Sequence, residues 1–269
     1  MAKKNADKNS RRAVIDDIRK KQSSAEKRRG LSIIVPLLLV AVLIVAAAAY
    51  RPVKDWWDER KFNDVSLASI GAKASACSDI TTQAADGNQS HVATGTTVTY
   101  TTAPPAFGSH WNESGVAPVA MEKKFYAWDE RPQLEALVHN LEHGYTIVWY
   151  DETVDEDSTE MQQLRAIAAK FPGDSNFRYK FKIVPWYTSK DNLPSDITQT
   201  DTAHVGGATF PKGMHIGITH WSKGGEDADV SDTSTQVGVF QYCKSISGAA
   251  LKTFMTKYPY LDSPEPDAM

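Results

Sequence analysis

The residue types best suited to chemistry are gathered in one short segment, His139-Asn140-Leu141-Glu142-His143-Gly144. Two histidines four positions apart on a helix lie on the same side and can bind one metal ion, with zinc or copper the expected metals. The spacing H-x-x-E-H is also that of inverted zinc proteases, but hydrolysis needs a longer helix and a third ligand. Gly144 instead ends the helix, so a structural role for imidazoles at the end of a helix is the alternative.

Further histidines are scattered along the chain. His110 lies in a proline-rich loop and is the first choice as an additional metal ligand. His91 and His204 lie near the ends of other predicted elements, so a cluster in space is allowed, although spacing alone cannot establish it. The sequence contains no nucleophile elbow, no phosphate-binding glycine loop, no C-x-x-C pair and no haem-attachment motif. With no complete catalytic set, we expect a protein that is not an enzyme and that has no obligatory cofactor.

An apolar stretch at residues 31–50, LSIIVPLLLVAVLIVAAAAY, precedes all of these residues. Twenty helical residues at 1.5 Å each span the roughly 30 Å hydrocarbon core of a bilayer. Residues 1–30 carry eleven Lys or Arg and four Asp or Glu, a net charge of +7, and the rest of the chain carries −10. Because basic residues that flank a span stay in the cytoplasm, we expect a single-pass plasma-membrane protein with a cytoplasmic N-terminus.

This topology divides the chain into four parts. We expect a basic cytoplasmic tail (1–30), a transmembrane helix retained as an anchor (31–50), a stalk (51–76) and one extracytoplasmic domain (77–269). The stalk begins with Trp56 and Trp57, which suit the headgroup level of a membrane. The tail is expected to be a disordered segment that sets topology, with a weakly amphipathic membrane-surface helix as the alternative.

The exported part contains two cysteines, Cys77 and Cys243. An exported domain meets an oxidising compartment, where a single pair usually forms a disulfide bond. The two residues are 166 positions apart, and closing a loop of that length stabilises a fold by at most roughly 5 kcal/mol. The net charge of −10 in the same part argues against nucleic acid as a partner.

Hydrophobic periodicity predicts a mixed α+β or α/β domain, with a mixed sheet and flanking helices. The central strand-helix-strand is expected to form a right-handed parallel unit. The expected elements are a strand at 91–102, a helix at 132–143, a strand at 145–150, a helix at 156–171, strands at 178–184 and 214–221, and a helix at 246–258.

Two segments carry a resemblance to a known family. The runs HVATGTTVTYTTAPPAFGSHW and LVHNLEHGYTIVWYDE, with a late Pro264-Glu265, resemble the bacterial domain-of-unknown-function family 3105 over most of residues 88–266. The resemblance implies a membrane-anchored, exported bacterial protein, often actinobacterial. The chain departs from the family at Phe107-Gly108-Ser109-His110, where Ser-Gly-Pro-His is more usual.

The 29.7 kDa mass, the single anchor and the exported domain are also similar to those of an accessory subunit of the actinobacterial cytochrome bcc–oxidase supercomplex. The resemblance therefore implies a non-catalytic accessory or assembly subunit that docks on subunits of a respiratory complex. Phe107, Trp111 and Trp221 are the expected docking residues, unless their rings fill the domain core. The alternatives are an exported metal-binding protein or metal-dependent enzyme of the cell envelope, using His139, Glu142 and His143, and a free-standing envelope-maintenance protein.

Overall fold

The computed structural model describes residues 19–20, 34–50, 53–54, 57, 60–156, 158–189, 193–194, 197 and 199–269. The chain divides into two compact units, residues 1–57 and residues 58–269. In the first unit, residues 34–50 are helical and their side chains are exposed. Within the part of the chain that is described, no helix meets the length and hydropathy needed to cross a bilayer. Residues 31–33 of the predicted span and Trp56 lie outside the described residues, while Trp57 is exposed.

The second unit is built on a five-stranded sheet with the order β1-β7-β6-β4-β5. β4 and β5 are parallel, and the pairs β4–β6, β6–β7 and β1–β7 are antiparallel, so the predicted mixed sheet is confirmed. The strands are β1 (Thr81–Ala84), β4 (Thr146–Tyr150), β5 (Phe181–Pro185), β6 (Ile216–Ser222) and β7 (Val237–Cys243). A separate pair joins β2 (His91–Val92) and β3 (His110–Trp111) in parallel.

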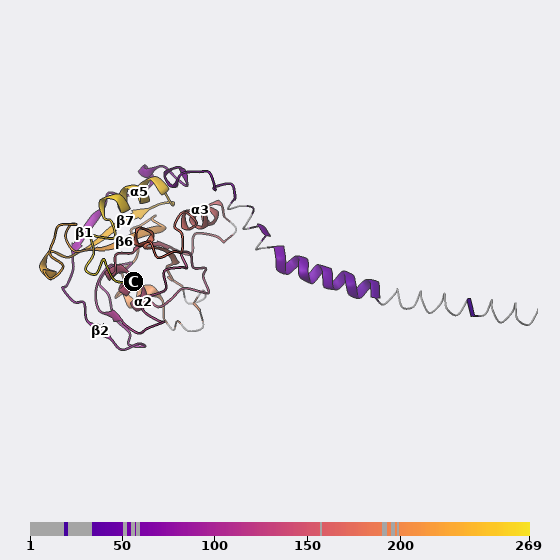
Figure 1. The fold of residues 1–269 in the computed structure, drawn as a ribbon, viewed down its shortest axis with the longest axis horizontal. Helices are drawn as coiled ribbons and strands as arrows, with labels where there is room; N and C mark the ends of the chain where they lie inside the picture. The colour runs from indigo at the N-terminus through magenta and orange to yellow at the C-terminus, as the bar shows by residue number, and fades with distance from the viewer. Residues whose placement is uncertain are drawn as a thin grey trace, which may run out of the picture. The chain divides into compact units, whose positions relative to one another are not determined.

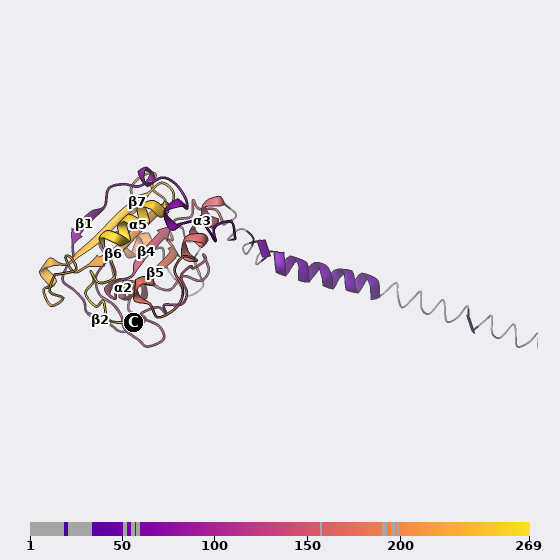
Figure 2. The same ribbon diagram turned by 45° about the horizontal axis from the view of Figure 1, so that its top comes forward.

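Helices cover both faces of this sheet (Figures 1 and 2). α3 (Thr159–Ala168) and α5 (Gly248–Lys257) pack on one face, and α2 (Leu134–Glu142) packs on the other. β4 is therefore buried on both sides, and its successive side chains alternate between the two hydrophobic clusters. This arrangement explains why β4 is continuously apolar in sequence, as strands covered on both faces are.

Most of the predicted elements exist with shorter bounds. The strand at 145–150 and the helix at 156–171 correspond to β4 and α3, and the helix predicted at 132–143 begins two residues later. The predicted strand at 91–102 is wrong, because only His91–Val92 pair and the rest of that run is loop. Its Thr and Val residues have strand propensity but no neighbouring strand long enough to pair with, and tertiary context overrides such a preference. β1, β3 and β7 lie in segments for which no strand was predicted.

Part of the segment expected to be a stalk lies in the second unit. Ile70 is fully buried, and Phe62, Val65 and Leu67 pack against the cluster formed with α3 and α5. The predicted disulfide bond is present: Cys77 follows this segment and is bonded to Cys243 at the end of β7. The bond therefore ties the segment that precedes β1 to the end of β7, the strand next to β1 in the sheet.

Candidate metal centre

The short β2–β3 pair places two histidines side by side. His91 and His110 are direct partners in its parallel register, and their ring centroids lie 4.9 Å apart. The two residues are far from each other in sequence, and neither strand is long enough to show a periodic pattern. The His110 side chain is fully buried, whereas the His91 side chain is 42% exposed. One histidine is thus fixed inside the domain and the other borders solvent.

The second half of α2 supplies the remaining side chains of the same cluster. His139, Glu142 and His143 are all buried. The side of the helix that carries the leucines packs on the sheet and is buried as well. α2 ends at Glu142, and Gly144 then takes a φ of +91° that favours glycine. A Cβ on Gly144 would lie 2.4 Å from the carbonyl oxygen of Tyr260, which is too close. The C-terminal segment can therefore pack against this turn because residue 144 is glycine.

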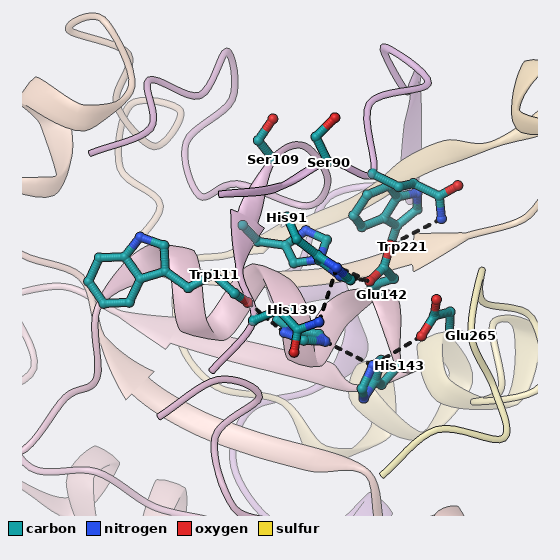
Figure 3. Close-up of polar contacts among 12 residues, drawn as sticks. Ser90, His91, Ser109, Trp111, His139, Glu142, His143, Trp221 and Glu265 are labelled. Atoms are coloured by element: carbon teal, nitrogen blue, oxygen red, sulfur yellow. Dashed lines mark hydrogen bonds and ion pairs between the residues drawn. The ribbon is translucent and has the colours of Figure 1, made fainter. Parts of the chain in front are cut away.

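Four side chains converge on one point, which we call the histidine cluster: His91, His110, His139 and Glu142. One ligand atom from each lies within 4.8 Å of all the others. The His110 Nε2 and Glu142 Oε2 atoms are 2.9 Å apart, and His91 Nε2 lies 3.7 Å from the same oxygen. Donor atoms around a tetrahedral zinc ion are about 3.3 Å apart, so a small contraction would suit such an ion. Figure 3 shows this convergence, with the Ser90 and Ser109 hydroxyls pointing away from it.

Backbone carbonyls orient two of the imidazoles. His110 Nδ1 lies 2.8 Å from the carbonyl oxygen of Gly108, and His139 Nδ1 lies 2.6 Å from that of Trp111. A carbonyl only accepts, so each Nδ1 carries the proton and each Nε2 of a neutral ring keeps a lone pair. Metal-binding histidines in proteins are held in the same way by a partner at the other nitrogen. Both rings therefore present the atom that a metal ion needs.

The close approach of His110 and Glu142 lacks a hydrogen bond that would explain it. His110 Nε2 and Glu142 Oε2 are both buried without a hydrogen-bond partner. A neutral His110 and an ionised Glu142 would face each other with lone pairs, which is costly away from water. A metal ion between the two atoms would satisfy both, and a proton on His110 Nε2 would be the other remedy. Glu142 Oε1, in contrast, accepts a hydrogen bond from the amide of Gln89 at 3.1 Å.

The electrostatics keep the cluster ready for a cation at neutral pH. Burial, with repulsion from His110 and His143, lowers the pKa of His139 to about 4. Burial by itself would raise the pKa of Glu142, but the neighbouring imidazoles, with that of His110 the closest, outweigh it, so the net shift is downward. At pH 7, His139 is neutral and Glu142 is ionised, the forms that bind metal ions.

A second group of ligand atoms adjoins the first. Glu142, His143 and Glu265 also place one ligand atom each within 4.8 Å of the others. His143 Nε2 lies 3.0 Å from His139 Nε2 and 3.3 Å from Glu265 Oε2. Figure 3 shows Glu265 reaching His143 from the C-terminal segment. Burial lowers the pKa of His143 to about 4, so this ring is also neutral at pH 7.

The C-terminal segment is fastened beside α2. The backbone N–H of Glu265 donates to the carbonyl of Glu142 at 3.0 Å. Lys180 Nζ donates to the carbonyls of His143, Pro266 and Ala268 at 2.7, 2.8 and 2.7 Å. A single buried lysine thus joins the end of α2 to the last residues of the chain, which holds Glu265 in place.

The aromatic residues predicted to be exposed docking residues are instead buried. Phe107, Trp111 and Trp221 are 6%, 8% and 0% exposed, so the prediction of an aromatic docking surface is wrong for all three. The Trp221 ring packs edge-on against His110, with centroids 6.2 Å apart. Trp111 contributes its carbonyl to His139 and its indole N–H to the carbonyl of Thr96. The Trp221 ring thus covers one side of the histidine cluster, and the Phe107 ring packs edge-on against Trp221, with centroids 6.3 Å apart.

The structure thus brings His110, His139 and Glu142, which the sequence predicted as candidate ligands, together with His91 and Glu265. The sequence had not predicted these two residues as ligands. His143 lies next to them but belongs to the second group. His91 was noted only as a histidine near a strand, and Glu265 only as part of the family resemblance. No local spacing joins either residue to α2. His204, the other scattered histidine, lies elsewhere, 3.8 Å from Glu135.

The comparisons with known proteins confirm the family resemblance. Residues 91–194 match the family described as Protein of unknown function (DUF3105). The matched range contains His91, His110, His139, Glu142 and His143 and stops well before Glu265. No significant match is found among curated proteins or among solved structures.

Proposed function

We propose that this domain binds a divalent transition-metal ion at a site within residues 91–194, the range that matches the domain-of-unknown-function family 3105, whose description names no activity. The ligands would be His110, His139 and Glu142, with His91 as the fourth at the solvent side. The observation that carries the proposal is the buried pair of His110 Nε2 and Glu142 Oε2, which lie 2.9 Å apart although neither atom has a hydrogen-bond partner. Imidazole and carboxylate ligands without a thiolate suit zinc or copper(II).

We propose binding rather than hydrolysis. In an H-x-x-E-H protease the glutamate activates a metal-bound water and is not a ligand. Glu142 Oε2 instead lies within the ligand set, 2.9 Å from His110 Nε2. The partly exposed His91 leaves one side of the site near solvent, which favours exchange of the ion with the surroundings. A role in holding or passing on a metal ion outside the cytoplasm fits this arrangement.

The test is the metal content of the purified full-length protein. After removal of bound metal and dialysis against zinc or copper, we expect at least one equivalent of one of them. The double variant His110→Ala/His139→Ala should bind at least one equivalent less, since loss of a partner that merely orients a ligand already weakens affinity by about 10–100-fold, and this variant loses two ligands. His215→Ala is the matched control, because His215 pairs with Asp151 and belongs to neither ligand group. A correctly folded wild type that binds neither metal would contradict the proposal.

A second candidate, compatible with the first, is that of an accessory subunit held at a membrane. It is supported by the helix at 34–50, whose large apolar side chains are 46–67% exposed, and by the basic segment before it. Exposed apolar surface of this extent is stable only against lipid or another protein. We propose that residues 31–50 anchor the chain in the plasma membrane, with the second unit outside, where it would join a cytochrome bcc–oxidase complex.

Gentle solubilisation of tagged full-length protein tests this candidate. We expect the protein in the membrane fraction, with cytochrome bcc and oxidase subunits co-purifying in near-stoichiometric amounts. A variant lacking residues 31–50 should leave the membrane fraction. Recovery of the tagged protein alone, together with unchanged respiration in a deletion strain, would rule out the respiratory role and leave the metal proposal unaffected.

A further inference from the structure

We infer a second metal position next to the first, formed by Glu142, His143 and Glu265, so that Glu142 bridges two ions. This inference rests on the proposed function, because the two positions share the Glu142 carboxylate. Both ligand groups contain Glu142, and each places its ligand atoms within 4.8 Å of one another. Two-metal sites in proteins hold their ions about 3.5–4 Å apart, which is the separation that a shared carboxylate permits.

The contacts between the two groups support a pair of ions. His139 Nε2 and His143 Nε2 face each other at 3.0 Å, although His139 Nδ1 already donates to the Trp111 carbonyl. With a metal ion on His139 Nε2, this nitrogen could no longer accept a hydrogen bond from His143. His143 Nε2 would then be free to face Glu265 Oε2, 3.3 Å away, and a second ion between them would use both.

The charge balance points the same way. A neutral His143 and two carboxylates, Glu142 and Glu265, would lie together without a cation. The Glu142 and Glu265 carboxylates each place an oxygen within 4.8 Å of the other, a separation at which two negative charges repel each other. A divalent ion would remove this repulsion. The Lys180 ammonium group lies close to the end of α2, but it donates to three carbonyls there.

The second position would differ from the first in the number and origin of its ligands. Its exposed ligand, Glu265, comes from the C-terminal segment, whereas the exposed ligand of the first position, His91, comes from β2; the other ligands of both positions are buried. With four ligands against three, the first position would hold its ion more tightly.

Zinc titration of metal-free, full-length protein tests the inference by stoichiometry. We expect two equivalents in the wild type and one in Glu265→Gln, which keeps the size of the side chain and removes its charge. His143→Asn, which removes another ligand of the second position, should also bind one equivalent. Glu156→Gln is the control, because Glu156 is similarly exposed and pairs with Arg165 of α3, on the opposite face of the sheet from α2. It should keep two equivalents.

The outcomes separate the two proposals. One equivalent in the wild type, unchanged by Glu265→Gln, would overturn the second position and leave the first. Two equivalents in Glu265→Gln would also overturn it, because the second ion would then not need Glu265. No bound zinc or copper in any variant would overturn the proposed function itself. As a second readout, two copper(II) ions on one carboxylate should give a spin-coupled paramagnetic resonance spectrum, and Glu265→Gln should give that of an isolated ion.

Discussion

The double variant Cys77→Ala/Cys243→Ala is expected to unfold with a free energy about 2–5 kcal/mol lower than that of the wild type. The disulfide bond joins residues 166 positions apart, and without it the unfolded chain gains the entropy of a long open loop. The bond also joins the segment around Ile70 to β7. In the double variant, this segment should therefore separate from the core at a lower denaturant concentration than in the wild type. Urea titration followed by tryptophan fluorescence measures the difference.

Reduction of the wild type is the control for this prediction. A reducing agent should lower the stability of the wild type towards that of the double variant and leave the variant unchanged. Equal stability of the oxidised wild type and the variant would contradict the expected role of the disulfide bond. Alanine is preferred to serine because Cys243 is fully buried, where a hydroxyl would add a cost of its own.

Metal binding is expected to raise the melting temperature of the domain by about 5–11 °C. An ion that binds only the folded state, present at a free concentration 100 times its dissociation constant, adds about 2.7 kcal/mol to the free energy of unfolding. For a domain of this size, each added kcal/mol raises the melting temperature by about 2–4 °C. Calorimetry with zinc, and then with a chelator added, measures the shift. A chelator should reverse it, since the stabilisation depends on the free metal concentration.

The variant His110→Ala/His139→Ala separates this effect from nonspecific binding of zinc. Its zinc-dependent shift should be smaller than that of the wild type, because the ion held by His110 and His139 is lost, while His215→Ala should keep the wild-type shift. A shift of equal size in the double variant would place the stabilising ion elsewhere on the protein. The comparison does not require the variants to be as stable as the wild type, because each is measured against itself.

Local sequence was sufficient for features that depend on neighbouring residues. β4 could be predicted because a strand covered on both faces is continuously apolar, and α3 because one side of it repeats at helical spacing. The disulfide bond could be predicted because an exported domain with two cysteines has only one way to pair them. β7 was missed although it is rich in valine and aromatic residues, and Gly238 within it weakens that signal.

Only part of the candidate metal centre could be predicted from the sequence. His139, Glu142 and His143 share the end of one helix, so their spacing marked them at once. His91 joins them through a two-residue strand pair with His110, and Glu265 joins through a C-terminal segment held by Lys180. Neither connection leaves a periodic pattern, because each is made by a few long-range hydrogen bonds.

The aromatic residues also show which features the sequence predicts and which features tertiary packing decides. Sequence established that Phe107, Trp111 and Trp221 lie near loops and strands that carry the candidate histidines, but it could not say which way their rings face. Tertiary packing decided that all three are buried and that Trp221 encloses His110. A ring faces the interior when a neighbouring element removes its apolar area from water, and that element is supplied by parts of the chain far away in sequence.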